Sequence, residues 1–322
     1  MKAIFLGILA ALFFACTFIL NRMMDLDGGS WIWSASLRYF FMVPLLLVIV
    51  MARKKVRPLI YEMKRKPGSW ILWSTVGFGL FYGPLCFAAA YGPGWLIAGT
   101  WMITIVSGSL LAPLFYETVQ TAGGPISRRG RIPRDGLLMS LIILLGIIVM
   151  QLDHIAKIST KEAVFSIVPL VIASFAYPLG NRKMMQICQG RLDAYQRVLG
   201  MTLASMPLWL VLSMIGIISI GLPGKDQVMQ TGAVALFSGV IATVLFFAAT
   251  DLAKGNIHKL GAIEATQSLE VLFAAAGEIL FLSTPYPSAL AWTGMVLVII
   301  GMVLHSMFSM NKQEASLQKK PA

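Results

Sequence analysis

Ten long apolar stretches constrain this chain more than any other feature. They cover about residues 3–21, 31–51, 70–90, 95–115, 136–152, 164–181, 197–220, 231–250, 260–282 and 289–309. A helix needs about 20 mostly apolar residues to cross a bilayer, and these stretches approach that length. Only 12% of the 322 residues are charged, whereas a soluble domain carries about 25%. The sequence therefore predicts an all-α polytopic membrane protein with ten transmembrane helices.

Basic residues alternate between the connections as the positive-inside rule expects. One alternate set of connections, together with Lys2 and the C-terminal tail, holds 20 Lys and Arg residues, including Arg182 and Lys183 after the sixth stretch. The other set holds only Arg22, Lys157, Lys161 and Lys225. We therefore expect a multi-pass protein of a bacterial-type inner (cell) membrane with cytoplasmic N- and C-termini. The same rule accounts for the net charge of +12 without a nucleic-acid partner.

The remaining segments are interpreted as connections or a tail. The first stretch is read as a retained helix rather than a cleaved signal, since nine more apolar stretches follow it. The longest connection, residues 117–136, is rich in Gly, Pro and Arg and is expected to be a mobile cytoplasmic linker. The three cysteines and three histidines are scattered, so neither a metal site nor a cofactor is predicted.

The two halves of the chain resemble each other at an offset near 160 residues. The matching pairs are Asn21-Arg22 with Asn181-Arg182, residues 85–89 with 245–249, Arg38 with Arg197, Glu117 with Glu278, and Gly146 with Gly301. The two Asn-Arg pairs are expected to close the first and sixth helices. Each match is weak alone, but an almost constant offset across five stretches indicates an internal repeat.

The parity of this repeat has a physical consequence. Each half contains five apolar stretches, so the second half enters the membrane in the opposite sense. Inverted repeats are a recurring plan among transporters, where they place a binding site near the middle of the membrane. We predict a first five-helix repeat at 1–157, a second inverted repeat at 158–310 and a cytoplasmic tail at 311–322.

The ninth stretch carries three acidic residues, Glu264, Glu270 and Glu278. A carboxylate in hydrocarbon costs roughly 2.5–3.5 kcal/mol on insertion scales, so these groups must face other helices, water or a ligand. In one continuous helix, Glu264, Gln267 and Glu278 share a stripe while Glu270 points elsewhere. We predict that this segment lines a pathway through the membrane. Glu270, Glu264 and Gln267 are candidates for binding substrate or a coupling proton; structural bonds to neighbouring helices are the alternative.

Two arginines lie inside or at the edge of apolar stretches. Arg38 either extends its charge to the lipid headgroups or binds a carboxylate of the ninth stretch or of the substrate. Arg197 is its counterpart in the second half. Structural capping or pairing is the favoured role for Glu117 and Glu278.

Four uncharged residues complete the candidate substrate site. Asn21 and Asn181 could hydrogen-bond a ligand, although tying helices together is the favoured alternative. Tyr91 and Trp101 could hold a lipophilic cation by cation–π contact. Aromatic residues in membrane helices usually pack against lipid or other helices, and Trp101 stands out because it is near the middle of its stretch.

These features resemble the drug/metabolite transporter superfamily in its ten-span branch, which includes multidrug resistance efflux transporters and EamA-like permeases. The resemblance is carried by the five-plus-five plan, Arg38, and the Glu278 segment followed by Ala291-Trp292-Thr293-Gly294 and Ile299-Ile300-Gly301. It implies secondary transport, often export of small organic molecules, driven by proton or substrate exchange. Four-span relatives carry an essential Glu in their first span, whereas residues 3–20 here contain no acid. A proton or cation site would then lie in the ninth stretch.

The sequence thus predicts a secondary active transporter that exports drug-like compounds or metabolites by alternating access. The first four stretches of each half should form the solute cavity, and the fifth and tenth should serve packing or homodimer contact. An exporter of amino acids or other metabolites, binding a carboxylate through Arg38 and Arg197, is the alternative. A membrane-embedded enzyme or non-transport subunit is less favoured, because no nucleophile–base pair, phosphate loop or soluble catalytic domain is recognisable.

Overall fold

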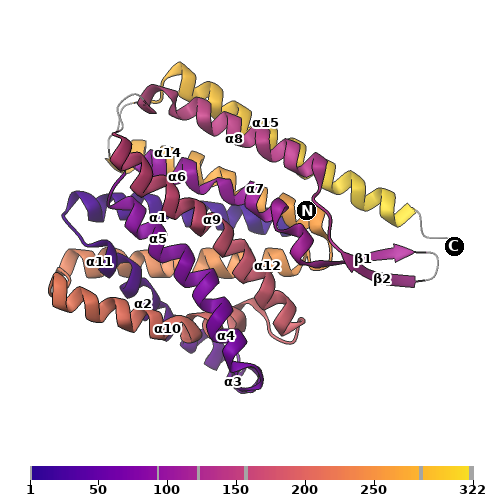
Figure 1. Ribbon diagram of the computed structural model, residues 1–322, viewed down its shortest axis with the longest axis horizontal. Coiled ribbons are helices and arrows are strands. Elements are labelled where there is room, and N and C mark those ends of the chain that lie inside the picture. The colour runs from indigo at the N-terminus through magenta and orange to yellow at the C-terminus, as the bar shows by residue number, and fades with distance from the viewer. Residues whose placement is uncertain (1, 93, 122–123, 156–158, 283–285, 319–322) are drawn as a thin grey trace.

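The computed structural model describes residues 2–92, 94–121, 124–155, 159–282 and 286–318 as a helical bundle with one small hairpin (Figure 1). The first half contains α1 (Lys2–Leu26), α2 (Trp31–Ala52), α3 (Val56–Arg65), α4 (Pro67–Ser74), η1 (Thr75–Gly79), α5 (Leu80–Ala89), α6 (Gly94–Trp101), α7 (Ile103–Leu110), η2 (Ala112–Leu114), β1 (Tyr116–Thr121), β2 (Gly124–Arg129) and α8 (Arg134–Ile155). The second half contains α9 (Thr160–Cys188), α10 (Ala194–Ser219), α11 (Lys225–Val234), η3 (Ala235–Ala242), α12 (Thr243–Asp251), α13 (Ile257–Ala265), η4 (Thr266–Ser268), α14 (Leu269–Leu282) and α15 (Ala289–Gln318).

Every predicted apolar stretch coincides with helical structure. Within the described ranges, seven helical segments are long and apolar enough to cross a membrane, and Leu96–Leu110 and Ala289–His305 are shorter apolar helices. This confirms a multi-pass helical membrane protein. The number of ten spans stays a prediction.

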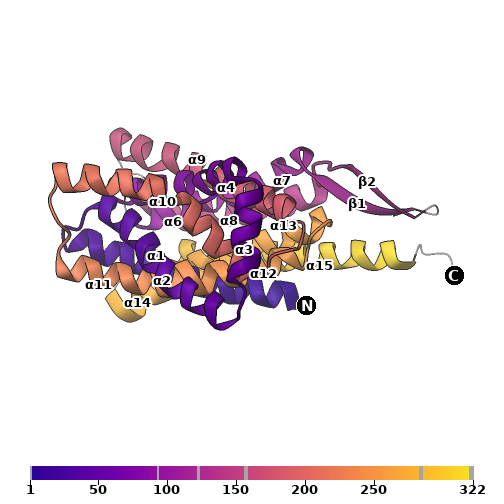
Figure 2. The same cartoon turned by 90° about the horizontal axis from the view of Figure 1, so that it is seen from below.

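The connections sort to the two ends of the bundle (Figures 1 and 2). The start of α1, the β1–β2 hairpin and the far end of α15 lie toward one end, and the α10–α11 connection lies at the other. The α9–α10 and α12–α13 connections also lie toward the hairpin end. This arrangement agrees with the alternation of basic connections in the sequence.

The segment expected to be a mobile linker contains two strands, so that expectation is wrong for residues 117–121 and 124–129. β1 and β2 pair antiparallel, with Tyr116 opposite Arg129 and Thr121 opposite Gly124. The Arg129 side chain donates to the Pro113 carbonyl at 2.9 Å, which ties the hairpin to the end of its preceding helix. Backbone pairing within the segment satisfies groups that an unpaired linker would leave to water.

Two membrane helices contain π-helical segments at matching places. The segment η1 lies between α4 and α5, and the segment η3 lies between α11 and α12. They begin at Thr75 and Ala235, which are 160 residues apart. Such π-helical turns are rare and frequently occur at functional sites. The shared offset is independent of the residue matches that first indicated the repeat.

Two further helices are also interrupted. α6 and α7 meet at Met102, and α13 continues into α14 through the 3₁₀ turn η4. In η4 the Thr266 hydroxyl donates to the Ile263 carbonyl at 2.6 Å, and the Ser268 hydroxyl donates to the Ala265 carbonyl at 2.7 Å. The two hydroxyls thus donate hydrogen bonds to backbone carbonyls. In a continuous α-helix, backbone N–H groups would donate to these carbonyls instead.

The Asn-Arg pairs do not close helices as expected. α1 continues to Leu26 and α9 to Cys188, so Asn181 and Arg182 lie inside α9 and both are buried. The placement of Arg182 and Lys183 in a basic connection is therefore wrong. The continuation of α9 beyond residue 181 is favoured because the buried Arg182 side chain forms an ion pair with Glu264.

α8 and α15 pack against each other along one edge of the bundle (Figure 1). Their close approach requires glycine, because a Cβ at Gly294 would lie 2.4 Å from the Gly146 carbonyl oxygen. Gly301 makes a similar approach to Ile143. This agrees with the packing role expected for the fifth and tenth stretches.

Candidate functional site

A small buried cavity lies among α1, α2, α5 and α6 of the first half and α9, η3, η4 and α14 of the second half. We call it the central cavity; it is lined by Phe14, Thr17 and Phe18 of α1, Arg38 of α2, Phe81 and Leu85 of α5, Trp101 of α6, Tyr177 of α9, Ser238 of η3, Gln267 of η4 and Glu270 of α14. Its free volume is about 10 Å³, which is room for about one water. The cavity is therefore contracted, and an organic solute could enter only after the helices move.

Arg38 is fully enclosed, with 2% of its surface exposed. Extension to the headgroups is therefore wrong for this residue. Its Nη2 donates to the Ser238 hydroxyl at 3.1 Å, and its guanidinium carbon lies 3.9 Å from the centre of the Tyr82 ring. The π-helical turn positions the acceptor, since the Thr243 hydroxyl bonds the Ser238 carbonyl at 2.9 Å. Arg38 thus presents a charge to the cavity rather than to the membrane surface.

A stacked aromatic wall holds the Arg38 segment in place. The neighbouring Tyr39 ring stacks on Trp209 with ring centres 4.3 Å apart and donates its hydroxyl to the Phe78 carbonyl at 3.3 Å. These contacts join α2 to α10 and η1. Aromatic stacking contributes about 0.5–1.5 kcal/mol beyond the burial of the rings, so the backbone that carries Arg38 is rigidly supported.

Glu270 faces the same cavity and is 2% exposed. The Trp101 side chain interacts with its carboxylate, and Trp101 also packs on Phe81 and Tyr177 with ring centres 4.9 and 5.9 Å away. The two residues come from α14 and α6. The structure therefore brings together Glu270 and Trp101, which the sequence could name only separately.

Gln267 joins Glu270 on the cavity wall, which corrects the helical-wheel prediction. That prediction placed Gln267 with Glu264 and put Glu270 on another side. Gln267 lies three residues from both Glu264 and Glu270, and residues three apart share a side of a helix, so either residue could face the same space as Gln267. In the structure Glu264 bonds Arg182, while Gln267 and Glu270 line the central cavity.

Several buried polar atoms of the central cavity have no hydrogen-bond partner. They are Thr17 Oγ1, Arg38 Nε, Tyr177 Oη, Gln267 Nε2 and Glu270 Oε1. A buried polar group without a partner costs about 1–3 kcal/mol, and a charged group costs more. Native proteins leave few such groups, and a cluster of them calls for a ligand or water. The central cavity is thus the best candidate for a solute site.

Glu264 is held in a separate buried ion pair. Arg182 Nη2 lies 2.8 Å from Oε1 and 2.7 Å from Oε2 of Glu264, and Arg182 Nε lies 3.1 Å from Oε1. Both side chains are at most 4% exposed. Gly108 of α7 leaves room for the carboxylate, since a Cβ there would lie 1.8 Å from Glu264 Oε2. Of the sequence alternatives for Glu264, the structural bond to a neighbouring helix is the one observed.

A larger pocket opens beside this ion pair. We call it the vestibule; it has a volume of about 350 Å³ and is lined by Phe115, Tyr116, Arg182, Met185, Gln186, Ala253, Lys254, Gly255, Asn256, Ile257 and Leu260. Its lining includes residues 253–256 of the α12–α13 connection and Tyr116 at the start of β1, and both elements lie toward the same end of the bundle. Arg182 thus lines the vestibule. Its partner Glu264 lies three residues before Gln267, which lines the central cavity. The ion pair therefore lies between the two spaces.

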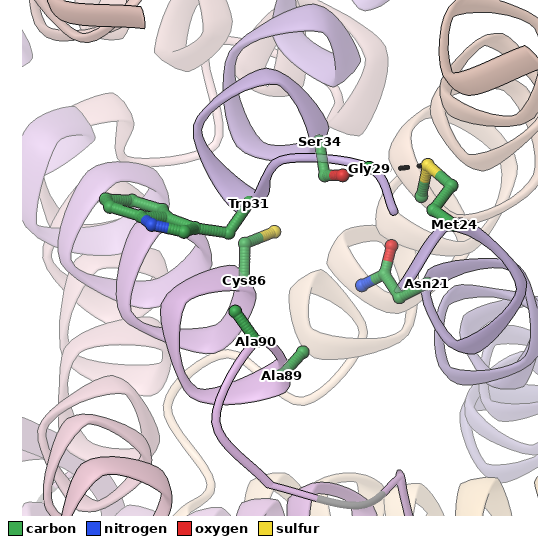
Figure 3. Close-up of a pocket in the computed structure, with 8 residues that line it drawn as sticks. All are labelled: Asn21, Met24, Gly29, Trp31, Ser34, Cys86, Ala89 and Ala90. Carbon is green, nitrogen blue, oxygen red and sulfur yellow. Dashed lines mark hydrogen bonds between the residues drawn. The ribbon is translucent and has the colours of Figure 1, made fainter. Parts of the chain in front are cut away.

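Asn21 lines a third, smaller space near the opposite end (Figure 3). That space is about 20 Å³ and lies between the end of α1, the start of α2 and the end of α5. The Asn21 carboxamide points into it, and the Ser34 hydroxyl donates to the Met24 sulfur at 3.6 Å. Asn21 Oδ1 is buried without a partner. Asn21 therefore does not reach the lining of the central cavity.

The other candidates divide between structural contacts and the surface. Asn181 is buried and donates to the Thr250 hydroxyl at 3.3 Å, as the helix-tying alternative expects. Tyr91 is 38% exposed and packs on Phe87 and Phe165, with ring centres 4.7 and 5.2 Å away. It follows the end of α5 and is not part of the central-cavity lining, so its place in a solute site stays a prediction.

Arg197 also has a structural partner. Its Nη1 bonds a carboxylate oxygen of Asp251, and its Nη2 donates to the Phe247 carbonyl at 3.2 Å. Arg197 Nε is buried without a hydrogen-bond partner, and a role for Arg197 in binding a solute carboxylate stays a prediction. The side chains of Glu117 and Glu278 lie outside the described part of the chain, so their capping role stays a prediction.

Comparison with known proteins decides the family. The model of a family described as "EmrE: Putative multidrug resistance efflux transporter" matches residues 1–311. The chain belongs to this family. The family is one of transporters. This confirms the assignment as a membrane protein of an efflux transporter family. A transporter family does not favour an enzymatic role.

Individual relatives support the same assignment. "Uncharacterized protein YjlA" of Bacillus subtilis (strain 168) is 58% identical over 309 residues, covering 96% of this chain and 95% of the relative. "Uncharacterized 42.1 kDa protein in intracellular alkaline protease 3'region" of Shouchella clausii is 50% identical over 270 residues, covering 84% and 70%. A solved structure titled "Crystal structure of protein" matches with a TM-score of 0.71 and 13% identity, covering 96% of this chain and 98% of that one; it supports the fold alone.

Sequence reasoning missed some residues of the site. Thr17, Tyr177 and Ser238 line the central cavity, yet each is an ordinary residue of an apolar stretch. Arg182 was counted with the connections although it repeats in the Asn-Arg pair at the 160-residue offset. That repeat was the available signal that Arg182 has a structural role inside the helix.

Proposed function

We propose that this chain is a secondary active transporter that exports small organic solutes by alternating access through the central cavity. The observation that carries the proposal is the meeting of Arg38 and Glu270 in one enclosed space that contains five unpartnered polar atoms. Charged residues inside a membrane bundle are costly and usually mark a substrate or ion pathway.

The chain consists of two inverted five-helix repeats. Exchange of conformation between the repeats converts a state open to one side of the membrane into a state open to the other. The π-helical segments that begin at Thr75 and Ala235 support this plan, because they recur at the same offset as the residue matches. Interrupted helices near the middle of the membrane are common in transporters built from inverted repeats. The inner-membrane location, the cytoplasmic termini and the ten spans belong to the same proposal.

The Arg182–Glu264 pair serves as the gate between the vestibule and the central cavity. Arg182 lines the vestibule, and Glu264 stands one turn before Gln267. Opening this end either separates α9 from α13 and breaks the pair, or moves both helices together with the pair intact. The vestibule lies on the cytoplasmic side by the positive-inside rule, so exported solutes enter through it.

Glu270 couples transport to protons. It is enclosed with an unpartnered oxygen, and a carboxylate in such a site can hold either a proton or a cationic group. Competition between the two gives exchange of proton for solute. A homodimer through the exposed faces of α8 and α15 also stays a prediction.

A specific observation favours the metabolite-exporter alternative in a narrower form. Arg38 lines the central cavity and has no acidic partner among the described residues, so it can bind a carboxylate, whereas Arg197 lies outside the cavity lining and is bonded to Asp251. A carboxylate-binding exporter would therefore use Arg38 alone. This form predicts that Arg38→Gln abolishes transport of an anionic solute and spares a cationic dye.

Flux measurements in proteoliposomes test the proposed function. Purified protein is reconstituted, a pH gradient is imposed, and uptake of cationic dyes, amino acids and organic acids is followed. We expect gradient-driven flux of at least one solute and a loss of more than about tenfold in Glu270→Gln, because Gln cannot bind a proton. Glu162→Gln is the matched control, since Glu162 is exposed and bonded within its own helix start. Unchanged pH-driven flux in Glu270→Gln would contradict the proposal.

A further inference from the structure

The vestibule can hold an organic molecule while the central cavity is contracted. Its volume is about 350 Å³, against about 10 Å³ for the central cavity, and ligand pockets usually measure about 300–1,000 Å³. Its lining comes from α9, from β1 and the residue before it, and from the α12–α13 connection with the start of α13. The two linings share no residue. The vestibule is therefore a separate space that a ligand can occupy without expansion of the bundle.

The charged side chains of the vestibule lining are cationic. They are Arg182 and Lys254, and no Asp or Glu is among the lining residues. Arg182 is already neutralised by Glu264, so Lys254 supplies the unmatched charge. Among the described residues no acidic side chain pairs with Lys254, and the nearby Asp251 is bonded to Arg197. A negative group in the vestibule would thus meet a counter-charge, whereas a positive group would meet none.

The aromatic wall of the vestibule also disfavours a cationic ligand. Phe115 lines the vestibule, and its ring centre lies 5.6 Å from the Arg182 guanidinium carbon and 5.0 Å from Lys183 Nζ. Two cations of the protein therefore already use the negative ring face that a cationic ligand would need. The apolar side chains of Met185 and Ile257 extend this wall, which suits the uncharged body of a ligand.

The first turn of α13 adds to the preference for a negative group. The Asn256 side chain caps this helix by accepting from the Lys259 backbone N–H at 3.0 Å, and Asn256, Ile257 and Leu260 all line the vestibule. The N-terminus of a helix carries a partial positive charge. It therefore attracts an acidic group in the same direction as Lys254 does.

We propose that the vestibule is a second binding site, which takes an organic anion with one acidic group and an apolar body. The acidic group lies near Lys254 and the start of α13, and the apolar body lies against Phe115, Met185 and Ile257. Both a membrane lipid with an anionic headgroup and a soluble aromatic or fatty acid have this chemistry. The site itself is independent of what the central cavity transports.

A bound anion inhibits export. α9 supplies Arg182 and Gln186 to the vestibule, and the α12–α13 connection supplies Lys254 and Asn256, so one ligand contacts the segments on both sides of the Arg182–Glu264 gate. It occupies the route by which a solute enters and holds these segments in their closed arrangement. This consequence rests on the proposed function, whereas binding of the anion does not.

Three probes that share one apolar body test the site. They are 2-naphthoate, its neutral amide 2-naphthamide and the cation 2-naphthylmethylammonium. Binding to the wild-type protein in nanodiscs of neutral phosphatidylcholine is measured by equilibrium dialysis at pH 7. We expect naphthoate to bind about threefold to tenfold more tightly than the amide, because one charge-assisted contact at a partly exposed site contributes about this much. Equal binding of the three probes, or tightest binding of the cation, would overturn the proposal.

Single substitutions locate the bound anion. Lys254→Gln should remove the preference for naphthoate over the amide and leave binding of the amide almost unchanged; Lys254 is exposed, so the variant is expected to fold. Lys225→Gln is the matched control, since Lys225 is an exposed lysine at the start of α11, beside the α10–α11 connection at the other end of the bundle. Arg38→Gln should not change naphthoate binding. A loss in Arg38→Gln without a loss in Lys254→Gln would place the anion in the central cavity and overturn the proposal.

The lipid composition of the nanodiscs distinguishes the two sources of the anion. Anionic phosphatidylglycerol replaces part of the phosphatidylcholine, and naphthoate binding is measured again. If a lipid headgroup occupies the vestibule, naphthoate affinity falls further in the wild type than in Lys254→Gln. Equal changes in the two proteins, with the dependence on Lys254 retained, assign the site to a soluble anion.

Transport measurements separate this proposal from the proposed function. Naphthoate added on the vestibule side should reduce the flux of a cationic dye, and it should do so less in Lys254→Gln when each protein is compared with its own uninhibited flux. If no solute is transported but naphthoate binding depends on Lys254, the binding site stands and the proposed function fails. If the dye is transported and naphthoate binding does not depend on Lys254, the site proposal is wrong and the transporter proposal stands.

Discussion

Arg182 and Glu264 form a two-pronged ion pair inside the helical bundle, with Nη2 of the arginine 2.8 and 2.7 Å from the two carboxylate oxygens. The pair joins α9 to α13, and neither side chain is more than 4% exposed. Because both partners are charged, such hydrogen bonds are roughly twice as strong as neutral ones, and the bidentate geometry adds specificity. The ion pair explains why Glu264 and Arg182 can be buried among apolar helices, since each charge has an opposite partner.

Breaking this pair from one side should destabilise the protein strongly. Glu264→Leu is expected to lower the free energy of unfolding by about 3–5 kcal/mol, because it leaves the Arg182 charge buried without a partner. Combining it with Arg182→Met should recover most of the loss, since no buried charge then remains. Thermal unfolding of the single and double variants in detergent measures this coupling. Additive losses in the double variant would mean that the two residues act independently.

A methyl group at residue 108 should disturb the same pair sterically. In Gly108→Ala the new Cβ would lie 1.8 Å from Glu264 Oε2, so α7 must shift or the pair must open. We expect a lower melting temperature even though alanine favours helices by up to about 1 kcal/mol over glycine. Gly83→Ala is the matched control, because a Cβ at Gly83 meets nothing within 4 Å. An equal melting temperature for the two variants would contradict the packing described here.

Arg38 should depend on Gly239 in the neighbouring π-helical segment. A Cβ at Gly239 would lie 2.7 Å from the Met42 sulfur and 3.4 Å from Arg38 Nε. Gly239→Ala is therefore expected to displace Arg38 from the Ser238 hydroxyl and to reduce solute transport by about tenfold or more. Transport by Gly232→Ala serves as the comparison, because its nearest neighbour is 4.0 Å away. Full activity in Gly239→Ala would show that Arg38 placement is not critical.

Asp193 should make stability depend on pH at the connection before α10. Burial of the Asp193 carboxyl raises its pKa, but the bond from Lys55 at 2.7 Å and the backbone N–H of Gln196 outweigh burial and hold the pKa below the ordinary value of 3.8. Because the folded pKa is depressed, this stabilisation is present above about pH 4 and is lost as pH falls through the folded value. Asp193→Asn should lower the melting temperature at pH 7, and the difference from wild type should shrink below pH 4. A difference that stays constant with pH would contradict this account.

The fold was largely predictable because its determinants are local in the sequence. Apolar length located the membrane helices, and the charge of the connections indicated their alternation. The interruptions at η1, η3 and η4 could not be predicted in this way, since apolar length does not distinguish an α-turn from a π- or 3₁₀-turn. The hairpin at residues 116–129 was missed because its Gly, Pro and Arg content is typical of a linker.

The candidate site was predictable only in part, for a related reason. Arg38, Glu270 and Trp101 stand out as polar or aromatic residues in apolar stretches, and the structure places all three at the central cavity. Gln267 was grouped with Glu264 rather than with Glu270, because it lies three residues from both and spacing alone does not choose between them. Tyr91 was included for its residue type alone. The two buried ion pairs depend on tertiary contacts that sequence spacing does not reveal; they join Arg182 to Glu264 and Arg197 to Asp251.

Accessibility from the two ends of the bundle tests alternating access most directly. In a chain whose three native cysteines are replaced by alanine, Ala89→Cys reports on the small space beside Asn21 and Gln186→Cys reports on the vestibule. Each is reacted with a membrane-impermeant thiol reagent in oriented membranes, with and without a transported solute or a pH gradient. The account predicts reciprocal changes, so that a condition raising reactivity at residue 89 lowers it at residue 186. Reactivities that rise together, or that do not respond to solute or pH, would contradict it.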